Sequence, residues 1–144
     1  MGKSVRDVMT PTVETASPSQ PLSEAAQTMK ISDIGSLPVV EEGRLVGMLT
    51  DRDIVVRAVA EGVDVNTVQV GDVASREPVT TAPEEDLDDA LALMARHRVR
   101  RLPVVEDGTL VGVLAQADVA LEAKEKNAGE MLQQISQPTS AERE

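Results

Sequence analysis

The sequence of 144 residues contains no cysteine, phenylalanine, tryptophan or tyrosine. Without cysteine, disulfide bonds and thiol chemistry are excluded. Without aromatic rings, a flat ligand must lie between aliphatic side chains and bind through backbone hydrogen bonds. No apolar run approaches the ~18 residues of a membrane span, and residues 1–20 lack the apolar core of a signal peptide. We therefore expect a cytoplasmic protein with no membrane partner.

Positive charge is scarce as well, with 14 Lys and Arg against 25 Asp and Glu and a net charge of −11. This balance disfavours sequence-independent binding to DNA or RNA, so we expect no nucleic-acid partner. Four of the 14 cations and the single histidine nevertheless gather between residues 96 and 101, in "RHRVRR". Two interpretations are open: a solvated helix end, where cations favour the C-terminal dipole, or a site for an anion.

What the chain does contain is an internal repeat. The stretches "IGSLPVVEEGRLVGMLTDRDI" (34–54) and "VRRLPVVEDGTLVGVLAQADV" (99–119) align without a gap at an offset of 65 residues. About nineteen of the fifty positions from Val5 to Ile54 are identical to their partners at this offset. Such self-similarity indicates a duplicated structural unit.

The sequence of each repeat predicts secondary-structure elements in the order β-α-β-β-α, preceded by a short helical turn at residues 5–9 or 70–74. Apolar spacing predicts helices over 21–31 and 86–97, and apolar runs predict strands over 37–40, 45–49, 102–105 and 110–114. A glycine in each hairpin turn is expected at positive φ. Extended segments lie at 13–16 and 79–81, and second helices over 51–61 and from 116 onward. Since one unit buries little alone, we expect two three-stranded sheets packed with pseudo-two-fold symmetry into one α/β (α+β) domain.

Thr50 and Asp53 stand where the second strand of the first hairpin passes into a helix. One interpretation is a capping box, in which Thr50 accepts from the Asp53 N–H and the Asp53 side chain reaches back. The other is a ligand site, in which the free N–H groups of the helix start bind phosphate and the carboxylate accepts from ribose hydroxyls. Spacing alone favours the cap.

Two copies of "LPVV(E/D)xGxLVGhL", the first followed by Thr-x-x-Asp, closely resemble the CBS-domain family. A tandem CBS pair, or Bateman module, would cover nearly the whole chain. The resemblance implies a first unit at 4–62, a linker at 63–69, a second unit at 70–122, and a C-terminal helix extension and disordered tail at 123–144. Small stand-alone CBS pairs of bacteria have a similar length.

The resemblance also implies a function: a non-catalytic regulatory module that binds an adenine nucleotide (AMP, ADP or ATP), or a related ligand such as S-adenosylmethionine or NAD, between its units. Carried over by position, the first cleft would comprise Thr50, Asp53, Pro78, Val79, Val99, Arg100 and Arg101. The second would comprise Asp118, Val13, Ile34, Gly35 and Ser36. The second cleft is expected to be the weaker, because Ala115 replaces the family's Thr or Ser and no cation is expected to face it.

This assignment gives Arg100 and Arg101 a phosphate-binding role, whereas Arg96, His97 and Arg98 are expected on a solvated helix end. A lone histidine without cysteine is a poor metal site, and no nucleophile–base pair stands out, so we expect no metal, no catalytic cofactor and no catalysis. The alternative function is a ligand-free structural or adaptor protein with an unknown protein partner. A homodimer is expected, because Val55, Val56, Ala58, Val59 and Ala60 would leave apolar surface exposed.

Overall fold

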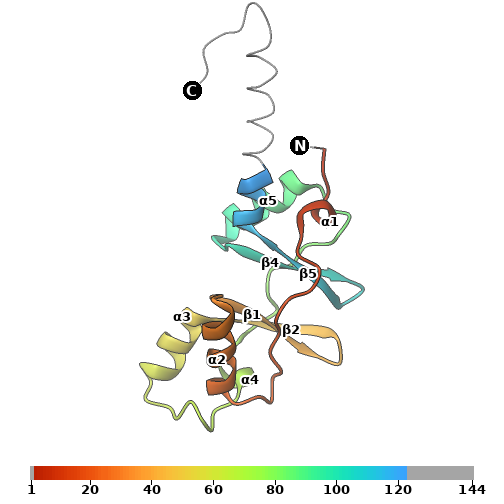
Figure 1. The fold of residues 1–144 in the computed structure, drawn as a ribbon. Helices are drawn as coiled ribbons and strands as arrows, with labels where there is room; N and C mark the ends of the chain where they lie inside the picture. Colours follow the sequence, from red (N-terminus) through yellow and green to blue (C-terminus); the bar gives the residue numbers. More distant parts are fainter. Residues whose placement is uncertain (1, 123–144) are drawn as a thin grey trace, which may run out of the picture.

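The computed structural model describes residues 2–122. Two antiparallel hairpins form its centre: β1 (Ser36–Glu41) with β2 (Arg44–Thr50), and β4 (Arg101–Glu106) with β5 (Thr109–Ala115) (Figure 1). Each turn has two residues of positive φ: 53° and 81° at Glu42 and Gly43, 53° and 82° at Asp107 and Gly108. This is the type I′ geometry that suits the strand twist, and it confirms the predicted glycines.

The hairpins join into one sheet in the order β1-β2-β5-β4, rather than forming the two separate sheets expected from the sequence. They meet only at their tips, where the N–H of Leu45 donates to the Gly108 carbonyl and the N–H of Leu110 donates to that of Gly43, both at 3.1 Å. The expected third strand of each unit is reduced to one parallel bridge, Ala16 to Val39 and Thr81 to Val104. The mixed α/β class is confirmed, but the sheets are continuous.

One long helix covers each hairpin, α2 (Leu22–Ser32) in the first repeat and α5 (Leu87–His97) in the second (Figure 1). Their buried residues follow the predicted helical spacing: Leu22, Ala25 and Met29 in α2, and Leu87, Ala90 and Met94 in α5. Both helices end at a left-handed residue, Asp33 and Arg98. Two hydrophobic cores result, one beneath each helix.

The short helices are exchanged between the repeats. The helix α1 (Val5–Val8) begins the first repeat, but Val5 is buried in the core of the second. The helix α4 (Val70–Val73) begins the second repeat, but Val70 and Val73 are buried in the core of the first. In Figure 1, α1 accordingly lies beside the second hairpin and α4 beside α2. The sequence repeat therefore does not coincide with the packing, and the unit boundaries given above stay a prediction.

Each exchanged helix leads into a segment that pairs with the other repeat's hairpin. Thr10 bridges Val113 of β5, and β3 (Ser75–Arg76) pairs with Met48 and Gly47 of β2. Glycine is needed for this approach, because a Cβ at Gly47 would lie 2.7 Å from the Ser75 carbonyl oxygen. Gly112 stands in the same relation to the Thr10 carbonyl, also at 2.7 Å.

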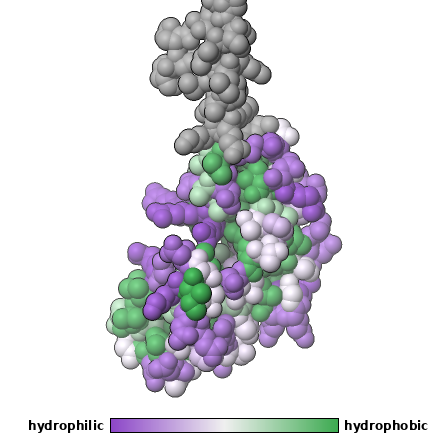
Figure 2. All heavy atoms as spheres, viewed as in Figure 1, coloured by the Kyte–Doolittle hydropathy of each residue, from purple (hydrophilic) through white to green (hydrophobic). Residues whose placement is uncertain are grey.

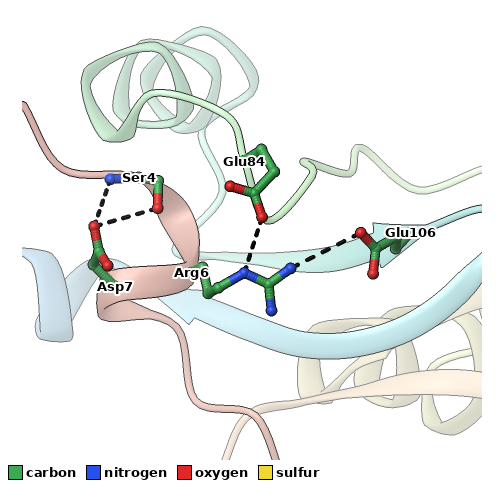
Figure 3. A network of polar contacts seen from close by, with 5 residues as sticks. All are labelled: Ser4, Arg6, Asp7, Glu84 and Glu106. Carbon is green, nitrogen blue, oxygen red and sulfur yellow. Dashed lines mark hydrogen bonds and ion pairs between the residues drawn. The ribbon is translucent and has the colours of Figure 1, made fainter.

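Ionic contacts fasten α1 to the second repeat (Figure 3). The Arg6 Nε lies 3.0 Å from a Glu84 carboxylate oxygen, and an Arg6 Nη lies 3.9 Å from Glu106. Ser4 and Asp7 close a capping box at the start of the helix. The Arg6, Glu84 and Glu106 side chains are exposed, so the buried Val5 contributes more to the docking than the ion pairs do.

The second helix of the first repeat consists of α3 (Asp51–Ile54) and the π-helical turn η1 (Val55–Val59). Val55, Val56 and Val59 are 57%, 46% and 61% exposed, as the sequence predicts. An apolar area is visible at the lower left of Figure 2, where Figure 1 shows α3 and the segment that follows it. The expectation is wrong for Ala58, which is fully buried as part of the first hydrophobic core. Residues 116–122 form the equivalent helix of the second repeat.

The predicted C-terminal extension and tail, 123–144, lie outside the described residues. Within residues 2–122, no helix has both the length and the apolar character needed to cross a bilayer.

Candidate functional site

A cavity of about 320 Å³ lies between the repeats, beside the start of the 116–122 helix. Four of the five residues predicted for the second cleft line it: Val13, Ile34, Ser36 and Asp118. Gly35 does not, and its carbonyl instead accepts a hydrogen bond from the Asp51 N–H at 2.9 Å. The cleft that the sequence marks as the weaker one therefore contains a cavity of ligand size.

Arg101 also lines this cavity, although the sequence comparison placed it in the first cleft. The expectation that no cation faces the second cleft is wrong. The reason is strand pairing: Arg101 begins β4 and stands opposite Ala115 at the end of β5, so it lies next to the helix that carries Asp118. A guanidinium and a carboxylate from the same repeat thus share one cavity.

Asp118 is half-buried and accepts no hydrogen bond from any residue in the described part of the chain. Its helix follows Ala115, which has no side-chain oxygen to cap the free N–H groups. Nothing among residues 2–122 therefore competes for the Asp118 oxygens. A partly buried carboxylate of this kind is suited to accept hydrogen bonds from the hydroxyls of a ligand.

The first cleft has a different geometry at the matching position. The Thr50 hydroxyl accepts from the Asp53 N–H at 3.0 Å, and an Asp53 carboxylate oxygen accepts from the Thr50 N–H at 3.0 Å. This is the capping box that the spacing predicted. One carboxylate oxygen of Asp53 is occupied by the Thr50 N–H, which leaves less of the group for a ligand than Asp118 has.

The remaining residues predicted for the first cleft do not line this cavity. Val79 and Val99 pack against the second core, and Pro78, next to Val79 in the chain, is half-buried. Arg100 is exposed, and its carbonyl accepts from the Gln116 N–H at 2.8 Å. A ligand role for these residues stays a prediction.

The other cationic positions agree with a helix end. Arg96 and His97 lie in the last turn of α5 and Arg98 is its C-cap, all exposed to solvent. No group of three or more His, Cys, Asp or Glu residues able to hold a metal ion occurs within residues 2–122.

Sequence reasoning missed several lining residues of the cavity. They supply hydroxyls, one carboxylate and an apolar floor: Thr10, Thr12, Glu14, Ser32, Pro38, Met48 and Val113. The offset of 65 relates Met48 to Val113, so a symmetric floor could have been inferred from the repeat. The contribution of Thr10 could not, because it follows from the docking of α1 on the second repeat, where Thr10 bridges Val113.

The CBS-domain profile matches residues 5–59 and 70–125. The chain belongs to the CBS-domain family. The CBS domain-containing protein YhcV of Bacillus subtilis is 48% identical over 92% of this chain and 95% of its own length. Hypoxic response protein 1 of Mycobacterium tuberculosis is 37% identical over 92% of this chain and 94% of its own length. This CBS pair is thus similar to small stand-alone CBS proteins.

Solved structures agree with this fold. The crystal structure of hypoxic response protein I with two coordinated zinc ions covers 83% of this chain and 98% of its own, with a TM-score of 0.77 and 38% identity. The crystal structure of CBSX2 in complex with AMP covers 88% of this chain and 99% of its own, with a TM-score of 0.78 and 28% identity. This chain therefore contains two CBS domains with the fold of solved CBS pairs.

Proposed function

We propose that this CBS pair is a non-catalytic, cytoplasmic regulatory protein that binds an adenine nucleotide in the cavity beside Asp118. The observation that carries the proposal is that the Asp118 carboxylate, which has no hydrogen-bond partner among residues 2–122, and the Arg101 guanidinium line one cavity between the repeats. A similar fold bound to AMP, in CBSX2, supports the choice of ligand.

Each chemical part of a nucleotide finds a matching group. Asp118 accepts hydrogen bonds from the ribose hydroxyls, and Arg101 donates to the phosphate. Apolar side chains, Ile34, Met48 and Val113, hold the base, as a chain without aromatic residues requires. The hydroxyls of the cavity wall add further polar contacts.

A regulatory role also agrees with the residues that line the cavity. Within residues 2–122, its carboxylates are Asp118 and Glu14, and the described lining contains no histidine or group of metal-ligating residues beside them. Nucleotide binding across the two repeats instead links their positions, because residues of both line the cavity.

Spectroscopy and calorimetry together test the proposal. Since the chain has no Trp, Tyr or Phe, near-ultraviolet absorbance that co-purifies and is released on denaturation must come from a bound ligand. Titration calorimetry of the ligand-free protein should then show AMP binding tighter than adenosine. Arg101→Ala should weaken AMP binding about tenfold and leave the affinity for adenosine nearly unchanged.

Arg96→Ala and Arg98→Ala are the matched controls, because both arginines lie at the exposed end of α5. Both variants should bind AMP like the parent protein. If Arg101→Ala also does so, the phosphate role of Arg101 is wrong. If adenine nucleotides do not bind at all, the alternative function, a ligand-free adaptor, is favoured.

We further propose a homodimer built on the first repeat's outer face. Besides the three exposed valines of η1, Ile31 of α2 is 82% exposed and Val63 is 41% exposed. Exposed large apolar side chains favour contact with another protein surface. Sedimentation of the purified protein should give twice the 15.3 kDa mass, and Val55→Glu with Val59→Glu should reduce it to the monomer. A monomeric parent protein at micromolar concentration would contradict the proposal.

A further inference from the structure

The cavity contains more negative than positive charge. Glu14 and Asp118 line it together with Arg101, which is the one cation among the described residues of its wall. Arg100 is absent from this wall and is exposed elsewhere. A ligand phosphate therefore meets one guanidinium, and the described residues of the cavity wall offer no second cation to an additional phosphate.

The volume of the cavity also favours a ligand with a single phosphate group. Its volume of about 320 Å³ is at the lower end of the range for small-molecule pockets, which is roughly 300–1,000 Å³. A nucleoside with a compact anionic group suits this volume better than a dinucleotide or an extended triphosphate does.

Glu14 occupies a position that distinguishes the two repeats. It lies between Val13, which lines the same cavity, and the bridge at Ala16 that anchors the segment to β1. The equivalent residue of the second repeat is Val79, which packs against the apolar core. The carboxylate at residue 14 is thus a feature of the Asp118 cavity and not of the repeat.

We propose that Glu14 is a specificity-determining residue that restricts the ligand to a single phosphate group, so that AMP binds and ATP is rejected. This inference rests on the proposed nucleotide-binding function. The phosphate of AMP, of charge about −2, pairs with Arg101. The β- and γ-phosphates of ATP would bring further negative charge next to Glu14, and like charges at close range disfavour binding.

The test compares AMP, ATP and adenosine by titration calorimetry without Mg²⁺, which would neutralise part of the ATP charge. The parent protein should bind AMP about tenfold or more tightly than ATP. Glu14→Gln should raise ATP affinity about two- to fivefold, a modest gain because Glu14 is exposed and its charge is screened. AMP affinity should change less, and adenosine affinity should not change.

Glu85→Gln is the control, since it makes the same change of net charge at an exposed carboxylate outside the cavity wall. If the parent protein binds ATP as tightly as AMP, or if Glu14→Gln and Glu85→Gln act alike, the role of Glu14 is wrong while nucleotide binding stands. If AMP, ATP and adenosine all fail to bind, the proposed function is wrong and the role of Glu14 is rejected with it.

Discussion

The two repeats have the same hairpin and the same Asp at the start of the following helix, but use that Asp differently. In the first repeat Thr50 precedes the helix, and Asp53 is bound into a capping box. In the second, Ala115 replaces the threonine, and Asp118 faces a cavity. The loss of a hydroxyl weakens the helix start but frees a carboxylate. The replacement of threonine by alanine at residue 115 therefore removes a helix cap and leaves the Asp118 carboxylate more available to a ligand.

The largest expected effect is a difference in AMP affinity between variants of the two equivalent aspartates. Asp118→Ala should reduce AMP affinity by about tenfold or more, since hydrogen bonds to a charged group are worth about 1.5–3 kcal/mol each. Asp53→Ala should leave affinity nearly intact and instead lower the free energy of unfolding by about 1 kcal/mol, because the capping box is lost. Calorimetry and urea unfolding of both variants measure the two effects. Loss of affinity in Asp53→Ala alone would assign the ligand to the first cleft.

The missing cap can be restored to sharpen the comparison. Ala115→Thr copies Thr50 into the second repeat and should raise the free energy of unfolding by about 1 kcal/mol. By binding Asp118 into a cap and adding atoms to the cavity wall, it should also weaken AMP binding. Urea unfolding and calorimetry on the one variant check both results. Stabilisation accompanied by tighter AMP binding would contradict the competition between cap and ligand.

A third difference between the repeats lies at the edge of β4, where Thr81 bridges Val104. Thr81 is 7% exposed, and its hydroxyl has no hydrogen-bond partner among the described residues, whereas the equivalent residue of the first repeat is Ala16. Thr81→Val removes the buried hydroxyl and keeps the shape, so we expect up to about 1 kcal/mol of added stability. Thr80→Val, at an exposed position, should change stability little. Destabilisation by Thr81→Val would show that the hydroxyl has a partner.

The smallest expected effect concerns the exchanged helix α1. The backbone hydrogen bond from Ser4 lowers the pKa of the Asp7 carboxyl below its ordinary value, and the Ser4 hydroxyl acts in the same direction. The folded state therefore favours the carboxylate, and this contribution is present above the ordinary pKa and lost as pH falls through the lowered one. Asp7→Asn should slightly reduce the acid dependence of unfolding below pH about 4. An unchanged acid profile would contradict this role.

Much of the fold follows from local sequence patterns. The repeat offset, the helical spacing of Leu22, Ala25 and Met29, and the two-residue turns at Gly43 and Gly108 predict elements that the structure contains. The Thr50–Asp53 cap could be predicted too, because its partners are three residues apart. These features depend on contacts within one element or between neighbouring ones.

The candidate site was only partly predictable. Four residues predicted for the second cleft line one cavity, which Arg101, predicted for the first cleft, and Glu14, not predicted for either, line as well. Assigning Arg101 by its position in the family's motif places it in the cleft of the opposite unit. This assignment does not take into account that Arg101 pairs with Ala115 and so lies beside the helix of its own repeat.

The sequence by itself determined the duplication, the hairpins, the long helices and the family, because periodicity and turn chemistry act over a few residues. Only the tertiary structure decided the exchange of α1 and α4, the joining of the hairpin tips at Arg44 and Thr109, and the cavity beside Asp118. The repeats carry nearly equivalent apolar faces, so their patterns alone do not specify which short helix each core takes. That choice depends on how the two halves bury surface together, with Gly47 and Gly112 admitting the crossing segments.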